Sequence, residues 1–511
     1  MIVPRRTVLA GLAAFPAASR AQPAPRRGGR LRVSVDQAMG VLNPLLTRTN
    51  PEYLLAELLY SGLTRLGTTM VAEPDLAESW TSSADLTEWT FRLRPGVVFH
   101  DGTPCTARDV AATFAAILDP KTASPARNNV GPIAGVTPAD DRTVVIRLRG
   151  PYADLPVALA YTNAKIVPAA NIEAGTPSLS RAANGSGPFK LVQFEPERLV
   201  VVERNPAYYD PARPYLDRVE VVVYPDPTAE ASALIAGDTD LMIAAQASEY
   251  SRLSTARGVT SMRVPSGQFL NINMACDQKP FSDVRVRQAL ALAIDREAMV
   301  QFIADGLGTP GNDVPISPAY RFYRAAPLRT RDAARARALL AAAGHPNGLD
   351  LTLIASTNPG SRTQLGVAVR EMVRDAGFRI EVQTMPHATY LDQIWKKGSF
   401  YVGFYNMQAT ADAIFSLLYT TDAAWPETRW NNPDFDRLVA EARVTTDEAR
   451  RAALYGEAQA LMHEQVPSVI PVFFDLLSAR RTYVQGFMTH PRGAVFRLDY
   501  ASLGDGAPRR G

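Results

Sequence analysis

Alternating apolar and polar positions predict several short β-strands in the first half of the chain. Such alternation places successive side chains on opposite faces of a sheet. It occurs over 31–35 and 89–93, and the apolar run 219–224 predicts a further strand. The runs 189–192 and 199–202 are spaced as a hairpin.

Helical spacing with start and stop signals predicts helices beside these strands. Thr106 and Asp109 have the spacing of a capping box, and their helix is expected to run to Leu118. A second helix is expected over 227–236, ending at Gly237. Together these segments indicate a mixed sheet with helices on its faces.

From about residue 267 the pattern becomes mainly helical. Strands are predicted at 349–354, 378–384 and 400–405, and they alternate with helices, which is typical of an α/β lobe. The apolar segment 469–474 predicts a late strand that returns the chain to the first lobe. The predicted helices of this region are 284–294, 296–304, 330–343, 361–375, 387–397, 433–442 and 447–465.

The first 21 residues have the features of an export signal. Arg5-Arg6 precedes the apolar run 8–18, and Ser19 and Ala21 are the small residues that precede a cleavage site. The arginine pair resembles a twin-arginine signal, while a Sec signal remains the alternative. We expect cleavage near Ala21, no lipid anchor, and a neutral mature chain in the periplasm.

Composition excludes several classes of protein. The chain has 511 residues, of which 46% are hydrophobic and 21% charged, as in ordinary globular proteins. No apolar run reaches the roughly 18 residues of a membrane span. The net charge of +3 carries no nucleic-acid footprint. Cys105 and Cys276 do not make a disulfide framework, and whether they pair is left open.

Candidate catalytic and metal motifs are incomplete. The run 306–311 fits a dinucleotide-binding pattern, but it follows a helix and contains Pro310. His463-Glu464 begins a zinc-protease motif whose second histidine is replaced by Pro467. We therefore predict no catalytic residue, no metal site and no cofactor.

Four long segments resemble the family 5 extracellular solute-binding proteins, the periplasmic receptors of peptide, nickel and opine ABC importers. They occur in the family's order and lie at 73–110, 185–209, 280–296 and 432–438. Their residues have structural roles. Trp80, Phe91 and Phe99 are expected core anchors, Gly187 is expected in a turn, and Asp283 is expected to cap a helix.

The resemblance implies an α/β fold, a two-lobe periplasmic binding protein clamp of type II, like the large peptide-binding proteins, with an inserted subdomain in lobe one. Crossing strands near 264–274 and 469–480 would form a hinge. The implied domains are the lobe-one core (22–44, 178–266 and 486–511), the inserted subdomain (45–177) and lobe two (267–485).

The resemblance also locates candidate ligand-binding positions. They lie in the loop after the first strand, early in the helix 361–375, and in the segment 405–412. The candidate residues are Gln37, Met39, Arg362, Tyr405, Met407, Gln408, Ala409 and Asp412.

These positions depart from the peptide-binding pattern. In peptide-binding members an aspartate in the segment that corresponds to 405–412 pairs with the ligand's ammonium group. In this chain Ala409 aligns with that aspartate. A free amino terminus on the ligand is therefore in doubt, unless Asp412 or another acid takes over. Met39 and Met407 suit an apolar pocket or a core, and Arg362 either binds a ligand carboxylate or is a solvated helix residue. Met407→Asp is expected to abolish binding and leave the fold intact.

The implied function is that of a non-catalytic import receptor. It would act as a monomer that captures a small molecule, a peptide or another small organic solute, and delivers it to ABC transporter permease subunits. An exported enzyme, or a sensor or chaperone partner on the same scaffold, is the alternative reading.

Overall fold

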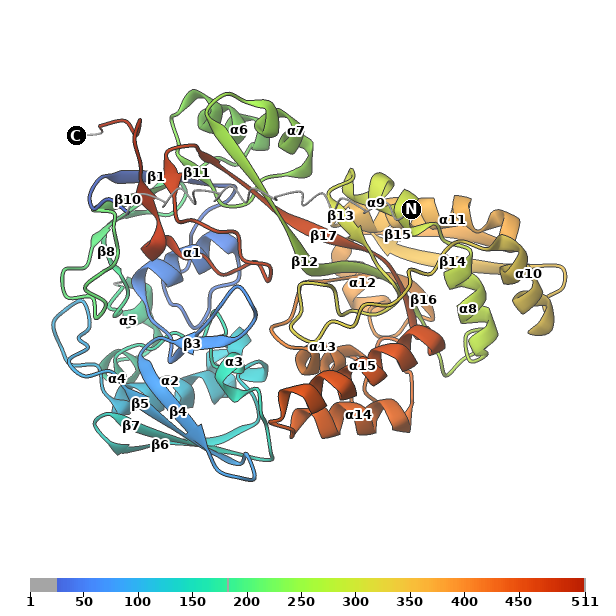
Figure 1. The fold of residues 1–511 in the computed structure, drawn as a ribbon, viewed down its shortest axis with the longest axis horizontal. Helices are drawn as coiled ribbons and strands as arrows, with labels where there is room; N and C mark the ends of the chain where they lie inside the picture. The colour runs from blue at the N-terminus through green and yellow to red at the C-terminus, as the bar shows by residue number, and fades with distance from the viewer. Residues whose placement is uncertain (1–24, 182, 510–511) are drawn as a thin grey trace, which may run out of the picture.

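The computed structural model describes residues 25–181 and 183–509, so the predicted export signal lies outside the described residues. Two bodies lie side by side (Figure 1). We call lobe one the body that carries β1–β11, and lobe two the body that carries β13–β16. The strands are β1 (Arg30–Val35), β2 (Thr64–Leu66), β3 (Ala72–Pro74), β4 (Ala77–Ser82), β5 (Glu88–Leu93), β6 (Ile133–Asp140), β7 (Thr143–Leu148), β8 (Phe189–Glu195), β9 (Leu199–Arg204), β10 (Arg218–Val223), β11 (Leu241–Met242), β12 (Val259–Met274), β13 (Gly308–Pro310), β14 (Leu349–Ser356), β15 (Phe378–Met385), β16 (Phe400–Tyr405), β17 (Ser468–Arg481), β18 (Val484–Gln485) and β19 (Ser502–Leu503).

Helices cover the sheets of both lobes, and their ends follow local sequence signals. Thr106 and Asp109 form the predicted capping box of α2, and Asp283 caps α8. Gly237 ends α6 with φ 87° in the left-handed conformation. The helices are α1 (Asn50–Leu59), α2 (Ala107–Leu118), α3 (Leu155–Ala158), α4 (Ala169–Glu173), α5 (Thr176–Arg181), α6 (Pro227–Ala236), α7 (Ala247–Thr255), α8 (Val284–Leu292), α9 (Arg296–Ala304), α10 (Ala333–Ala342), α11 (Ser361–Met372), α12 (His387–Gln393), α13 (Ala411–Leu418), α14 (Pro433–Arg443) and α15 (Glu448–Gln465).

One 11-stranded sheet runs through both lobes. Its order is β15-β14-β16-β12-β17-β11-β1-β10-β9-β8, with β13 beside β17. The strands β1 and β10 are parallel, as are β14 and β15, while β8-β9 is the predicted hairpin. The predicted mixed α/β sheet is therefore confirmed.

Two long antiparallel strands, β12 and β17, connect the lobes (Figure 1). Residues 259–264 of β12 pair within lobe one, and residues 268–273 pair within lobe two. The register shifts between Pro265 and Gln268, where the regular ladder is interrupted. The late strand predicted at 469–474 is thus longer than expected and continues into lobe one.

A separate four-stranded sheet, β4-β5-β7-β6, lies in the part of lobe one furthest from β12 (Figure 1). Phe91 and Phe99 are buried in its neighbourhood, as predicted. Trp80 is only half-buried, because it lies on β4 at the edge of this sheet and packs against the core from outside. The prediction that Trp80 anchors the core is therefore confirmed in part, since the ring contacts Phe91 but is not fully buried.

Gly187 marks a close approach within lobe one. A Cβ atom at Gly187 would lie 2.4 Å from the Leu59 carbonyl carbon, at the end of α1. The backbone of the family segment 185–209 is therefore packed directly onto that helix end, and a side chain at this position has no room.

In lobe two, the sheet separates two apolar cores. Leu270 and Val402 face the core made with α8–α11, whereas Phe269 faces the core made with α13–α15. This division follows the two-residue period of the strands. None of the helices in the described part of the chain is both long enough and apolar enough to cross a membrane.

Candidate solute-binding cleft

The carboxyl ends of strands from both lobes converge on the register shift in β12. Tyr405, the last residue of β16, pairs with Phe269 just beyond the shift. On the other side, β11 approaches the shift from lobe one, and the Ala245 amide donates to the Leu477 carbonyl oxygen at 2.8 Å. Since β1 is parallel to β11, Gln37 follows at the same edge. Ligands of open α/β sheets bind outside the carboxyl ends of strands, so the interface between the lobes at this edge is the candidate site.

Lobe two has a topological switch point at this edge. The strand β14 has parallel neighbours on both sides, β15 and β16. The helix α11 packs Leu365 into one core, while Tyr390 of α12 meets Tyr401 on the opposite face of the sheet. The two helices therefore lie on opposite faces, and their N-termini flank the carboxyl ends of β14 and β16, which is where a ligand is expected at such a switch point.

Arg362 lies at this switch point, in the first turn of α11. Its side chain is 93% buried, with the guanidinium carbon 5.2 Å from the Tyr390 ring centroid and 5.9 Å from that of Phe404. Within the described residues its Nε and Nη1 atoms have no hydrogen-bond partner. Burial lowers the pKa of Arg362. A buried cation with free donors beside a helix N-terminus is suited to an anionic ligand group.

Asp412 is not available for a ligand in this conformation. It lies in the first turn of α13, because the predicted loop ends at its N-cap residue Thr410. Its carboxylate pairs with Arg443 Nε at 2.9 Å and accepts a hydrogen bond from Ser416. Burial raises the pKa of Asp412, and Arg443 opposes this shift.

The two candidate methionines lie in apolar cores. Met39 is fully buried in the lobe-one core, and Met407 is 2% exposed beside Phe269. The sequence left open whether these methionines line a pocket or belong to a core. In the structure both belong to a core. The burial of Met407 argues against the expectation that Met407→Asp leaves the fold intact, because this substitution would bury a charge.

The remaining candidates lie around the gap between the lobes. Gln37 is exposed at the end of β1. Tyr405 is buried at the end of β16, with its ring 6.1 Å from that of Trp425. Gln408 and Ala409 line a cavity of about 20 Å³ that also includes residues of lobe one. The structure thus brings the 405–410 segment to the interface between the lobes.

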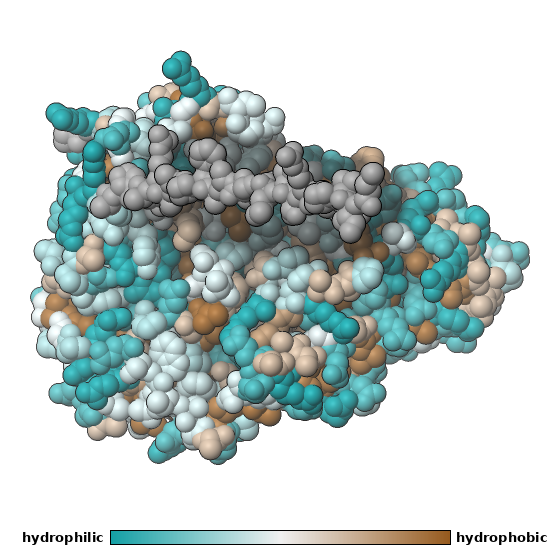
Figure 2. Space-filling model, viewed as in Figure 1, coloured by the Kyte–Doolittle hydropathy of each residue, from teal (hydrophilic) through white to brown (hydrophobic). Residues whose placement is uncertain are grey.

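The lobes are closed on each other at the end remote from the β12–β17 connection, where α3 lies near α13 (Figure 1). Asp154 pairs with Arg451 at 2.7 Å, and both side chains are only 6% exposed. The Ala153 amide donates to the Arg443 carbonyl oxygen at 3.0 Å. In the space-filling view the two surfaces meet along this lower part of the molecule (Figure 2).

Sequence reasoning missed an acid near this site. Glu427, between α13 and α14, is 1% exposed, and its Oε2 accepts a hydrogen bond from Asn273 Nδ2 at 2.6 Å. Burial raises the pKa of Glu427 to about 7. A lone glutamate beside a proline in a polar segment gives no signal of burial, so only the fold reveals it.

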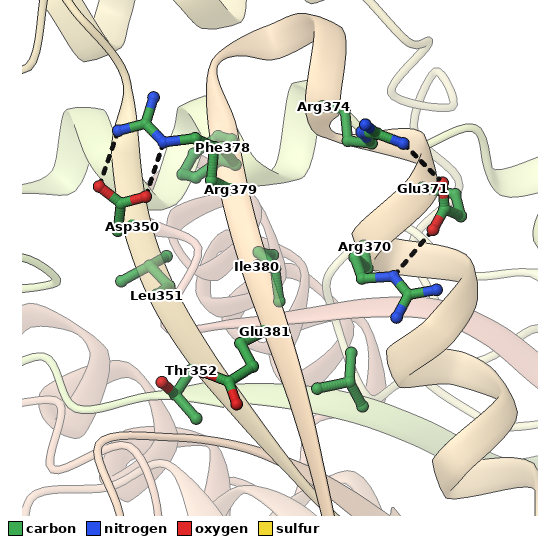
Figure 3. A pocket seen from close by; sticks show the side chains of 11 residues that line it. Asp350, Leu351, Thr352, Arg370, Glu371, Arg374, Phe378, Arg379, Ile380 and Glu381 are labelled. Atoms are coloured by element: carbon green, nitrogen blue, oxygen red, sulfur yellow. Dashed lines mark hydrogen bonds and ion pairs between the residues drawn. The ribbon is translucent and has the colours of Figure 1, made fainter.

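A surface hollow of about 860 Å³ is a poor candidate for the site. It lies between α11 and the edge strand β15 (Figure 3). Most of its charges are paired with one another, Arg379 with Asp350 and both Arg370 and Arg374 with Glu371. Glu381, which also lines it, accepts a hydrogen bond from Gln383. These side chains are largely exposed, so the hollow presents no buried unpaired charge to a solute.

Comparisons with known proteins agree with this architecture. Residues 71–425 match the model "Bacterial extracellular solute-binding proteins, family 5 Middle". The glutathione-binding protein GsiB of Escherichia coli (strain K12) is 29% identical over 473 residues, covering 90% of this chain and 92% of GsiB.

Solved structures show the same two-lobe fold. AgaA of A. tumefaciens R10, in complex with agropinic acid, is 27% identical with a TM-score of 0.76, covering 93% of this chain and 99% of AgaA. HbpA2 of Haemophilus parasuis is 23% identical with a TM-score of 0.84, and the match covers 93% of this chain and 100% of HbpA2. The chain therefore belongs to family 5 of the bacterial extracellular solute-binding proteins and is the binding component of an ABC importer.

Proposed function

We propose that this receptor captures a small organic solute that carries a carboxylate, a peptide or a peptide-like molecule such as an opine. The observation that carries the proposal is Arg362, a buried guanidinium with unpartnered donors at the switch point of lobe two. An unpaired buried cation is costly, and a ligand carboxylate held by two parallel hydrogen bonds would offset that cost.

Known ligands of relatives support this class of solute. Glutathione, named for the relative GsiB, and agropinic acid, bound in the AgaA structure, are both carboxylic acids. Each contains an anionic group that a guanidinium recognises. For this chain the shared carboxylate, and not either molecule, is the basis of the proposal.

Transport requires the lobes to open and close around the solute. We propose a hinge in the crossing strands near 264–274 and 469–480, with the lobe-one core at 22–44, 178–266 and 486–511, the inserted subdomain at 45–177, and lobe two at 267–485. The register shift at 265–268 supports this position, because a broken ladder bends more easily than a regular one. The closed form would then dock on the permease.

The mature receptor would work as a periplasmic monomer. Export through the twin-arginine route, cleavage near Ala21 and the absence of a lipid anchor complete this proposal. Native mass spectrometry of the protein purified from the periplasm would give both the mature mass and the oligomeric state.

The same measurement tests the solute class. A retained molecule of a few hundred daltons that is an acid supports the proposal, and a retained neutral sugar or bare metal contradicts it. If no molecule is retained, the solute class is tested by thermal shift with dipeptides, glutathione, agropinic acid and neutral sugars. A bound ligand raises the melting temperature of the protein.

Substitution of Arg362 tests the assignment of the residue. Arg362→Gln should weaken the binding of an identified acid by about 100-fold, because a charged hydrogen-bonded pair is lost. Arg370→Gln, on the same helix but in the exposed hollow of Figure 3, should leave affinity unchanged. Equal affinities of the wild type and Arg362→Gln would contradict the assignment.

A further inference from the structure

We propose that a cavity inside lobe two binds a small aromatic acid that carries a hydroxyl group. The cavity has a volume of about 230 Å³ and lies between β13, the loop 311–332 that follows it, and α15. In Figure 1 this loop is the yellow segment between β13 and α10. An apolar cavity of about 150 Å³ is enough to hold benzene, so this one has room for a substituted ring.

This cavity is separate from the interface between the lobes. The residues that line it belong to lobe two, and neither Arg362 nor the segment 405–412 is among them. An occupant would therefore bind without displacing the solute, and the inference goes beyond the proposed function.

Polar contacts hold the loop in place around the cavity. Gln459 of α15 donates from Nε2 to the Phe322 carbonyl oxygen at 2.8 Å, and its Oε1 accepts from the Arg324 amide at 2.9 Å. The fully buried carboxylate of Asp313 pairs with Arg329 near the other end of the loop at 2.8 Å. The cavity is thus preformed, as binding pockets for small molecules usually are.

The floor of the cavity is apolar. Val314 and Ile316 of the loop and Phe473 of β17 line it and are buried. Such walls suit the faces of a planar ring. Phe473 pairs with Phe269 just beyond the register shift, so an occupant would contact one of the two strands that connect the lobes.

His463 provides an acceptor for a hydroxyl group. Its Nδ1 lies 2.9 Å from the Asn312 carbonyl oxygen, so Nδ1 carries the proton and donates. Burial lowers the pKa of His463, so the ring is neutral at pH 7 and Nε2 keeps a lone pair. The part of the chain that the structure describes gives Nε2 no hydrogen-bond partner. A hydroxyl group in the cavity could donate to it.

Arg324 provides the charge. Its side chain lies at the exposed rim of the cavity, where Nη1 donates to the Gly456 carbonyl oxygen at 2.9 Å. Among the described residues it forms no ion pair, so the guanidinium can bind a carboxylate. The apolar floor, His463 and Arg324 together define the proposed class of occupant.

Two incomplete sequence motifs meet at this cavity. Thr309 and Pro310 belong to the run 306–311, and His463 begins the interrupted zinc-protease motif. In the structure the run contains the strand β13, and the histidine donates to a carbonyl oxygen, so neither motif forms its usual site. Both segments instead form walls of the cavity.

The test uses three probes that differ in one group. They are para-hydroxybenzoate, benzoate, which lacks the hydroxyl group, and para-hydroxybenzyl alcohol, which lacks the carboxylate. Calorimetry with the mature protein should give a dissociation constant below about 1 mM for para-hydroxybenzoate. The other two probes should bind about 5-fold more weakly or less, because each loses one hydrogen-bonding group.

One substitution and two controls locate the site. Ala460 is an exposed residue of α15 that lines the cavity, so Ala460→Phe should fill the cavity and abolish binding. Ala453→Phe is the matched control, at an exposed position of the same helix outside the cavity. Arg362→Gln is the second control, because an acid bound between the lobes would depend on Arg362. Both controls should bind para-hydroxybenzoate like the wild type.

Two further variants assign the polar groups. Arg324→Gln should weaken para-hydroxybenzoate binding by about 10-fold and leave that of the alcohol unchanged, since only the carboxylate loses its partner. The side-chain amide of His463→Asn can still donate to the Asn312 carbonyl oxygen but offers no acceptor in the place of Nε2. This variant should lose the preference for para-hydroxybenzoate over benzoate.

Three results would overturn the inference. They are no heat of binding with para-hydroxybenzoate at millimolar concentration, unchanged affinity in Ala460→Phe, and loss of binding in Arg362→Gln. The last result would place the acid between the lobes and leave the proposed function standing. Conversely, a transport solute whose affinity does not change in Arg362→Gln would contradict the proposed function alone.

Discussion

A buried ion pair joins the two lobes in the closed arrangement, and the effect of removing it is our most specific prediction. Asp154 precedes α3 in lobe one, and Arg451 lies on α15 in lobe two. Their side chains meet at 2.7 Å and are each 6% exposed. The variant Asp154→Asn keeps the size of the side chain and removes its charge, so Arg451 becomes an unpaired cation when the lobes are closed.

The size of the effect follows from what Arg451 retains. Removing one partner of a buried pair costs about 3–5 kcal/mol. Arg451 Nε still donates to the Ala442 carbonyl oxygen at 3.1 Å, and its guanidinium carbon still lies 5.0 Å from the Phe322 ring centroid. We therefore expect about 2–3 kcal/mol. When lobe one moves away, Arg451 would be exposed to water, so we expect this cost to fall on closure alone.

Closure and solute affinity are linked, so two assays report a change in the ratio of closed to open protein. A shift of about 2–3 kcal/mol corresponds to about 30- to 150-fold in the ratio of closed to open protein. Small-angle scattering should show a larger radius of gyration for unliganded Asp154→Asn than for the wild type. Calorimetry with the identified solute should show an apparent dissociation constant raised by up to the same factor.

A surface pair in the same subdomain is the control. Glu88 and Arg147 form an ion pair whose side chains are 44% and 67% exposed, and Glu88→Gln should change neither assay, because exposed pairs contribute little. If Asp154→Asn has the radius of gyration and the affinity of the wild type, the pair does not stabilise closure and the reasoning is wrong.

Three further predictions concern the folded state. Burial raises the pKa of Glu427 from 4.5 to about 7, so the folded state binds more protons than the unfolded state between those values. The free energy of unfolding of the unliganded wild type should therefore fall by about 3 kcal/mol relative to Glu427→Gln as pH rises from 4 to 8, and a constant difference in urea titrations would refute this. Gly187→Ala should destabilise the protein by about 3 kcal/mol or more, since its Cβ would lie 2.4 Å from the Leu59 carbonyl carbon; Gly135→Ala, with no atom within 4 Å of its Cβ, is the control in thermal melts. Met407→Asp should unfold the protein or sharply lower its melting temperature, while Met407→Leu should keep the circular dichroism spectrum and melting temperature near those of the wild type.

Local signals in the sequence determined most element boundaries. The capping box of Thr106 and Asp109 begins α2 where it was predicted, and Gly237 ends α6. These features depend on contacts between residues a few positions apart, so the chain itself contains the whole interaction. The family segments likewise identified the fold, because they hold the turns and close approaches that this fold requires.

The tertiary structure alone decided the length of the connecting strands and the state of the acids at the site. β17 extends to Arg481 because residues 476–481 find partners in β12, far away in the sequence. Asp412 is engaged because the fold brings Arg443 beside it, whereas Glu427 is buried beside Asn273 and forms no ion pair within the described residues. Burial and pairing of a charge depend on segments that meet only after folding, so no local pattern distinguishes these two carboxylates.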